Sequence, residues 1–154
     1  MKRGADWLAF IGVIALLGVV LLVEGKKSVQ LQSQIPLSAK ELYSKLAHSQ
    51  VKLQILDVRT GSDGYEDSHI PGAIPLPGGD LASASSEVRE RVFSYVPTLV
   101  VSYDGDSKAF EACRANFPLA RNLAGGMTAW TSANYPEDSG EWVPPKNHAG
   151  GGCL

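Results

Sequence analysis

The stretch LQILDVR, Leu53–Arg59, is the part of the sequence that decides the fold. In the slightly longer segment Val51–Val58, polar and apolar residues first alternate and then become mostly apolar. This pattern is typical of a strand that enters a sheet buried on both faces. A polar loop, RTGSDGYEDSH, follows the strand. We therefore expect one strand of a buried sheet here, with a loop at its carboxyl end.

Helices and strands are predicted to alternate along the rest of the chain. Ser38 and Glu41 stand at the spacing of a capping box, which predicts a helix start. Further along, the pattern predicts an apolar segment at 73–76, a helix carrying Val88, Val92 and Phe93 that closes at Pro97, a strand in TLVVSY (98–103), a helix in SKAFEACRANF (107–117), a short strand in ARNL (120–123) and a final short helix in AGGMTAWTSANYP (124–136). Such alternation favours an α/β fold, a parallel sheet flanked by helices.

An uncharged apolar run, WLAFIGVIALLGVVLLV, covers Trp7–Val23 near the amino terminus. Its length fits the short end of what spans a bilayer, and it lacks the Ala-x-Ala pattern of a cleaved signal peptide. We expect one transmembrane helix within an anchor at 1–27, and this helix contacts lipid through residues 7–23. After the anchor we expect a tether at 28–35, a domain at 36–138 and a flexible tail at 139–154. The short amino-terminal side normally stays in the cytoplasm, so the domain of this single-pass protein is expected in the periplasm of a bacterial inner membrane.

Charge and composition exclude several classes of partner. The formal net charge is -2, and no run of lysine or arginine exceeds two residues, so nucleic acid is not an expected partner. The histidines His48, His69 and His148 are scattered, and the two cysteines lie forty residues apart. The sequence therefore predicts neither a metal site nor a cofactor.

Three motifs in the expected order resemble one family. LQILDVR followed by GYEDSHIPGAIPLP, and later LAGGMTAW, are similar to motifs of the rhodanese-like sulfurtransferase domain, over residues 36–136. The resemblance implies that family's parallel sheet flanked by helices. The residues at its motif positions are Asp57, Arg59, His69, Gly72, Gly125, Gly126 and Trp130. We interpret them as structural: an ion pair and a histidine that fasten loops, and a tryptophan that covers the sheet.

The loop after TLVVSY departs from the family pattern. Active members carry a cysteine there in a loop of the form C-x-x-G-x-R-S, and this chain has none in that loop. If Gly105 is the loop glycine, Ser102 takes the cysteine position; if the phase of the strand governs, Tyr103 takes it. The degenerate loop comprises Ser102, Tyr103, Asp104, Gly105, Asp106, Ser107 and Lys108. A hydroxyl cannot accept sulfane sulfur as a thiolate does, and the two aspartates would repel anionic thiosulfate.

The two cysteines stand in different settings. Cys113 lies between Phe110 and Phe117 on one predicted helical face, which indicates a core position. Cys153 is the penultimate residue and follows three glycines, an arrangement similar to sulfur-carrier proteins. An extended chain from Trp142 to Cys153 spans about 35 Å. Cys153 is a candidate sulfur carrier, a candidate for a disulfide with a partner or a second copy, or an inert thiol.

The sequence thus favours a membrane-anchored rhodanese-like domain without catalytic activity. We expect it to bind a protein partner or to act as an accessory subunit of a membrane complex, because the scaffold motifs are retained around a loop without its nucleophile. The alternative is a persulfide carrier or sulfurtransferase component that uses Cys153 on a mobile carboxy-terminal arm.

Overall fold

The computed structural model describes residues 35–48, 52–61, 64–105 and 107–145. The predicted membrane span at 7–23, Asp106 and Cys153 lie outside these ranges. Within them, no helix has the length and apolar character needed to cross a membrane. The described residues from Pro36 onward belong to one compact unit.

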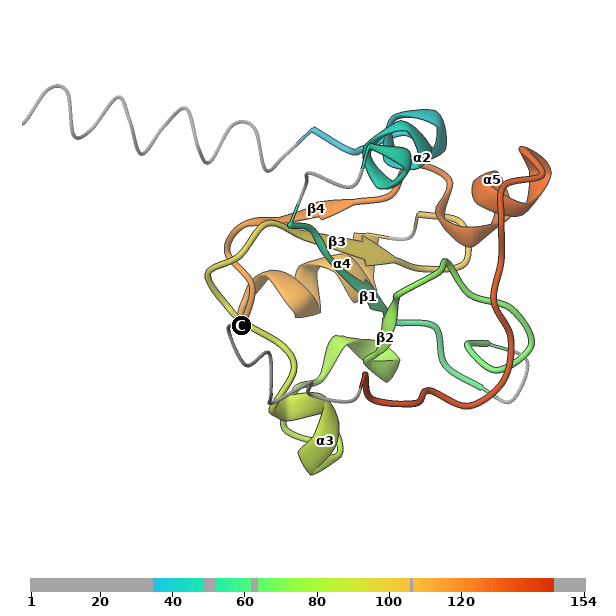
Figure 1. Ribbon diagram of the computed structural model, residues 1–154. Helices are drawn as coiled ribbons and strands as arrows, with labels where there is room; N and C mark the ends of the chain where they lie inside the picture. The colour runs from blue at the N-terminus through green and yellow to red at the C-terminus, as the bar shows by residue number, and fades with distance from the viewer. Residues whose placement is uncertain (1–34, 49–51, 62–63, 106, 146–154) are drawn as a thin grey trace, which may run out of the picture. The chain divides into compact units, whose positions relative to one another are not determined.

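Four parallel strands form the sheet at the centre of this unit (Figure 1). They are β1 (Gln54–Asp57), β2 (Ile74–Pro75), β3 (Thr98–Val101) and β4 (Ala120–Asn122), arranged in the order β2-β1-β3-β4. The register pairs Leu56 of β1 with both Ile74 and Val100. The predicted α/β fold, a parallel sheet flanked by helices, is confirmed.

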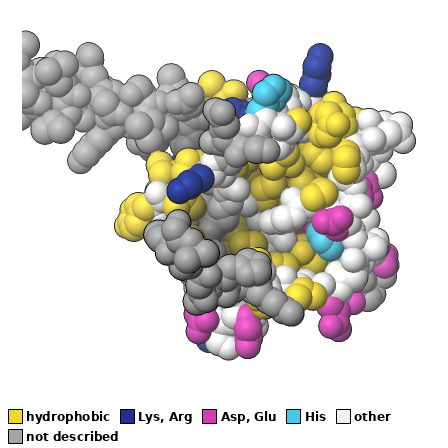
Figure 2. All heavy atoms as spheres, in the orientation of Figure 1, with side chains coloured by type: hydrophobic (Ala, Val, Ile, Leu, Met, Phe, Trp, Pro, Cys, Tyr) yellow, Lys and Arg dark blue, Asp and Glu magenta, His cyan; other side chains and the backbone are white. Residues whose placement is uncertain are grey.

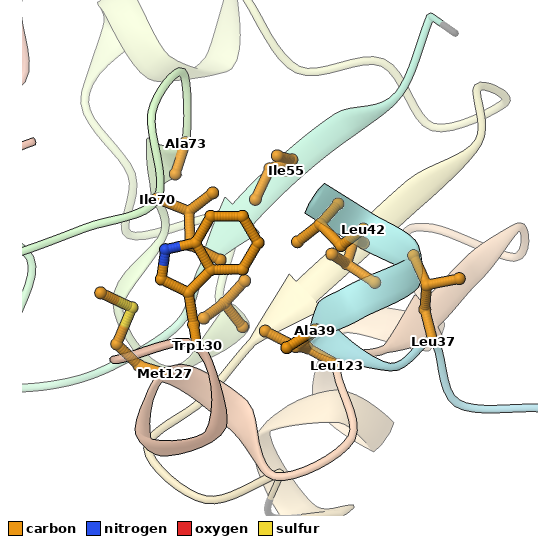
Figure 3. Close-up of a cluster of buried hydrophobic side chains, with 11 residues drawn as sticks. Leu37, Ala39, Leu42, Ile55, Ile70, Ala73, Leu123, Met127 and Trp130 are labelled. Carbon is orange, nitrogen blue, oxygen red and sulfur yellow. The ribbon is translucent and has the colours of Figure 1, made fainter. Parts of the chain in front are cut away.

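Helices α2 (Ala39–Ala47) and α5 (Gly126–Ser132) cover one face of the sheet. The predicted capping box begins α2: the amide of Glu41 donates to Ser38 Oγ over 3.3 Å, and the amide of Ser38 donates to Glu41 Oε2 over 3.0 Å. Figure 3 shows Trp130 of α5 amid side chains from α2, β1 and the loop before β2. The indole is fully buried, and its Nε1 donates to the Pro136 carbonyl over 2.9 Å.

The other face is covered by α3 (Ser86–Arg89), the 3₁₀ turn η1 (Pro77–Gly79) and α4 (Ser107–Arg114). Phe110 and Cys113 of α4 are buried with Phe117 and with Val100 of β3, so the predicted core position of these side chains is confirmed. The helix predicted over 107–117 ends at Arg114, and Phe117 follows it. Alternate residues of each central strand therefore serve the two cores, as the two-residue period of a strand requires.

The helix predicted up to Pro97 ends much earlier, at Arg89, and this prediction is wrong beyond that point. The Gln54 side chain at the start of β1 takes the place of helical partners, because its Oε1 accepts from the amide of Phe93 over 2.8 Å. Phe93 is 60% exposed instead of lying in the core.

Candidate functional site

The site lies where the two central strands end. Asp57 closes β1 and is paired in register with Val101, which closes β3. From β1 the chain proceeds to β2 on one side, and from β3 it proceeds to β4 on the other. A crevice opens at such a switch point in parallel sheets, outside the carboxyl ends of the strands. The loops that begin at Val58 and at Ser102 form its two sides.

Asp57 and Arg59 form a buried ion pair in the first of these loops. Arg59 Nη2 lies 2.7 Å from Asp57 Oδ2, and the side chains are 4% and 1% exposed. Arg59 Nε donates to Asp57 Oδ1 over 3.0 Å, and the Arg59 amide donates to the same oxygen over 3.1 Å. The guanidinium also donates to the carbonyl of Ser68. The positive charge of Arg59 is therefore neutralised by Asp57, and the guanidinium holds the loop through its hydrogen bond to Ser68.

The loop after β3 folds over Ser102, which is buried. Ser102 Oγ accepts a 3.0 Å hydrogen bond from the amide of Gly105, where φ is +86°. Asn122 of β4 supports the same turn, because its Nδ2 donates to the Gly105 carbonyl over 2.8 Å. The serine hydroxyl is therefore held inside the loop by a hydrogen bond to the loop's own backbone.

Carbonyl groups of this loop cap helix α5. The amide of Met127 donates to the Ser102 carbonyl over 2.8 Å, and that of Thr128 donates to the Tyr103 carbonyl over 2.9 Å. The Thr128 hydroxyl donates to the Tyr103 carbonyl as well. The residue before α5 is Gly125, which has no side chain to cap the helix, so the loop supplies what a capping side chain normally would.

Tyr103 closes the crevice between the two loops. Its hydroxyl donates to the Thr60 carbonyl over 2.8 Å, and the Arg59 guanidinium lies 5.6 Å from the centre of its ring. Tyr103 and Arg59 line both a hollow of about 330 Å³, together with Ser102, Asp104 and Thr60, and a second of about 270 Å³ that reaches α5. A ring at this position divides the space above the strand ends.

The electrostatics of the larger hollow do not favour an anion. Asp104 is exposed at its rim, and the guanidinium within it is already paired with Asp57. Lys108 is exposed on α4 and has its own interactions. Asp106 and the side chain of Ser107 lie outside what the structure describes.

His69 lies outside this crevice, in the loop between β1 and β2. Its Nδ1 is 2.8 Å from the Tyr65 carbonyl, and its ring stacks on Tyr65 with centroids 3.8 Å apart. Its backbone pairs with Asp138 in an antiparallel bridge. Gly72, three residues further along the chain, has a φ of +79° and follows Pro71 in a turn closed by the 2.9 Å hydrogen bond from the Ala73 amide to the Ile70 carbonyl. These contacts hold a loop in place.

Cys113 is remote from the crevice chemistry. It is fully buried, and burial raises the pKa of its thiol to about 12. At neutral pH it is a protonated core side chain. Among the described residues, no group of three or more histidine, cysteine or acidic side chains is placed to hold a metal ion.

Sequence reasoning missed the contacts that join distant segments. The bond from Tyr103 to Thr60 spans forty-three residues, and that from Asn122 to Gly105 spans seventeen. Their partners Thr60 and Asn122 belong to no motif of the sequence, so no local signal marks these two contacts. The only indication was the shared carboxyl edge, which predicts that loops after neighbouring parallel strands meet.

Comparison with known proteins agrees with this architecture. The model of the rhodanese-like domain family matches residues 38–133. The chain belongs to the rhodanese-like domain family. The crystal structure of the Alr3790 protein from Anabaena is 31% identical, with a TM-score of 0.56 over 68% of this chain and 80% of that one. The solution structure of the rhodanese-like domain of Alr3790 is 26% identical, with a TM-score of 0.57 over 77% of this chain and 88% of that domain.

A curated relative of this rhodanese-like chain comes from Bacillus subtilis. The protein YrkF, provisionally named a sulfur carrier protein, is 29% identical over 110 residues, which are 70% of this chain. The match spans 57% of the length of YrkF. Thiosulfate sulfurtransferase from Pseudomonas aeruginosa is similar in fold alone, at 21% identity and a TM-score of 0.56 over 72% of this chain and 21% of that enzyme.

Proposed function

We propose that this chain is a membrane-anchored rhodanese-like domain that does not transfer sulfur through its own loop and works by binding a protein partner. The observation that carries the proposal is Ser102: the position at the base of the β3–α4 loop holds a buried serine whose hydroxyl is hydrogen-bonded to the loop backbone. We assign Ser102, rather than Tyr103, to the family's cysteine position, since Gly105 then stands at the loop glycine.

Two features of the crevice support an inactive loop. A serine hydroxyl is a weak nucleophile unless an adjacent base removes its proton, and the hydrogen bonds of Ser102 within the described chain involve backbone groups alone. A negatively charged sulfur donor would meet Asp104 at the rim, while Arg59 is neutralised by Asp57. The surrounding contacts nevertheless keep the loop in a defined shape, as a binding surface requires.

The membrane part of the proposal rests on the sequence. The run Trp7–Val23 is long enough to anchor the chain, with the domain on the periplasmic side of a bacterial inner membrane. An anchored binding domain is suited to serve as an accessory subunit of a membrane complex.

A second candidate function is favoured by the similarity to YrkF. In this alternative, Cys153 carries a persulfide on the arm that follows Trp142, and the domain positions the arm or recognises its partner. Since Cys113 is buried with its pKa raised to about 12, the remaining thiol of the chain is the one that could carry sulfur. A disulfide through Cys153 would occupy the same thiol.

Isolation of the full chain from its native membrane in mild detergent, without reductant, separates the two functions. Intact mass measurement followed by proteolysis then locates any added mass. The proposal predicts an unmodified Cys153 and a membrane subunit that co-purifies in constant stoichiometry. A sulfur adduct on Cys153, with no such subunit, would replace the proposal by the carrier function.

A further inference from the structure

We propose that a groove beside β2 binds an extended, basic and apolar segment of a partner protein. This inference rests on the proposed partner-binding function and names the chemistry of the partner. The groove has a volume of about 800 Å³ and lies between β2, the segment around Phe93 and the residues 137–145, which we term the C-terminal strap.

The C-terminal strap is a fixed wall of this groove. The amide of His69 donates to the Asp138 carbonyl over 2.7 Å, and the amide of Asp138 donates back to the His69 carbonyl over 2.9 Å. The amide of Gly140 donates to the Glu66 carbonyl, and the partly buried Trp142 side chain packs against the core cluster that contains Leu76 and Val88. Figure 1 shows the strap descending from α5 beside the loop that joins β1 to β2. The groove therefore exists before any partner arrives.

Apolar side chains are exposed within the groove. Val143 is 75% exposed and Phe93 is 60% exposed, and both line it together with the half-buried Ile74 and Trp142. Large apolar side chains gathered in one exposed hollow mark surfaces that another protein covers. Since the lining is this open to solvent, it suits a chain laid across it rather than an enclosed small molecule.

Negative charge surrounds these apolar side chains. Glu137, Asp138 and Glu141 line the groove and are exposed, whereas Arg91 is the single cation among its described lining residues. Asp138, Glu141 and Arg91 form no salt bridge within the described part of the chain. Figure 2 shows acidic side chains along the side of the molecule where the strap runs, with hydrophobic side chains exposed beside them. Charge complementarity therefore requires lysine or arginine in the occupant.

Side chains, rather than backbone pairing, must provide the recognition. The amide of Leu76 points to β1, where it donates to the Asp57 carbonyl over 2.7 Å. Because backbone amides alternate in direction along a strand, the backbone nitrogen of the preceding residue points away from β1, toward the free edge of the sheet. That residue is Pro75, which has no N–H to offer an added strand. A partner segment gains its affinity from apolar contacts with Phe93 and Val143 and from charge contacts with the strap.

The test uses the full chain in nanodiscs of uncharged lipid, with empty nanodiscs as the blank. Fluorescence anisotropy measures binding of a short labelled peptide of alternating lysine and leucine. The groove variant combines Glu137→Gln, Asp138→Asn and Glu141→Gln. A matched control, Asp67→Asn, Asp80→Asn and Glu111→Gln, removes the same charge elsewhere. Each exposed charge pair contributes modestly, so we expect about tenfold weaker binding for the groove variant and less than about twofold change for the control. Equal losses in both variants, or no binding by the unaltered chain, would overturn the inference.

A second pair of variants tests the apolar contact. Phe93→Ser removes a groove side chain, whereas Tyr95→Ser removes an even more exposed aromatic residue that does not line the groove. We expect about fivefold weaker binding for Phe93→Ser and little change for Tyr95→Ser. Sedimentation of the unaltered chain adds one arm: self-association that Phe93→Ser abolishes would identify a second copy as the occupant and overturn the inference.

The groove and the inactive loop fail independently. If the unaltered chain does not bind the peptide, the proposed role of the groove is wrong, whereas a co-purifying subunit would still support partner binding. Sulfur transfer by a chain that lacks Cys153 removes the proposed function, whatever the peptide does.

Discussion

Gly126 approaches the loop after β3 so closely that a Cβ atom on it would stand 2.4 Å from the carbonyl oxygen of Ser102. The same Cβ would lie 2.6 Å from the Gly105 nitrogen. The glycine pair at the start of α5, Gly125 and Gly126, therefore allows the helix to contact the loop, and the loop carbonyls cap the helix in return. Shape at the crevice and stability of α5 depend on one another.

Replacement of Gly126 by alanine should destabilise the domain strongly. The residue has a φ of +56°, and the added methyl group meets backbone atoms that have no room to move. Strain and overpacking together predict a loss of about 3 kcal/mol in the free energy of unfolding. Gly72→Ala is the matched control: φ is +79°, but the space is open, and we expect a loss of about 1 kcal/mol. Urea unfolding measures both; similar losses in the two variants would show that the close approach is not what matters.

The buried pair of Asp57 and Arg59 should show strong coupling. Arg59→Leu alone leaves the Asp57 carboxylate buried without its partner, at an expected cost of about 3–5 kcal/mol. The double variant Asp57→Leu with Arg59→Leu should lose much less than the sum of the single variants. A double-mutant cycle by urea unfolding measures the coupling, and strictly additive losses would contradict a structural pair.

The thiol of Cys113 should resist alkylation in the folded protein. In a Cys153→Ser chain, iodoacetamide at pH 8 is expected to label Cys113 about 100-fold more slowly than an exposed reference thiol at Ser44→Cys, because burial raises the pKa of Cys113 to about 12. Labelling in urea should remove the difference. Comparable rates in the folded state would mean that this cysteine is accessible and remains a candidate for sulfur chemistry.

The titration of Tyr65 should lower the free energy of unfolding at alkaline pH. Burial, and then the charges of Asp57 and Asp138, raise its pKa from 10.0 to about 12. Because the pKa of Tyr65 is higher in the folded chain than in the unfolded chain, its contribution to the free energy of unfolding is complete below pH 10 and is lost as the pH rises toward 12. Tyr65→Phe loses the 2.8 Å hydrogen bond to the Ala73 carbonyl, which costs about 1 kcal/mol at pH 7.

The comparison between Tyr65→Phe and the unaltered chain isolates this titration. Both chains titrate Cys113, but only the unaltered chain titrates a tyrosine at position 65. The gap between their unfolding free energies should therefore narrow between pH 10 and pH 12. A constant gap across that interval would show that the phenol titrates as it does in the unfolded chain.

Local patterns in the sequence predicted the elements of this fold, because each depends on neighbours in the chain. The capping box at Ser38, the strand that ends at Asp57, and the buried face of Phe110, Cys113 and Phe117 are of this kind. The predicted length of the helix before β3 was too great, since the amide of Phe93 bonds to the side chain of Gln54, thirty-nine residues away. No periodicity records such a competing partner.

Candidate site residues were predictable to the extent that strand ends converge. Arg59, Ser102 and Tyr103 line the crevice and the buried Asp57 is paired with Arg59, whereas His69 lies apart from it and its backbone bonds to Asp138. The tyrosine that closes the crevice and the strap that walls the groove both depend on contacts between distant segments. Those contacts follow from tertiary packing and could be found only in the structure.

Transfer of sulfur from thiosulfate to cyanide by the Cys153→Ser chain tests directly whether the loop after β3 is inactive. This substitution keeps every residue that lines the crevice and excludes the thiol of Cys153 as a source of turnover. We expect no rate above that of a buffer blank, for this variant and for one that also carries Ser102→Ala. Turnover by Cys153→Ser that disappears with Ser102→Ala would show that the loop around Ser102 is an active site, contrary to the proposed function.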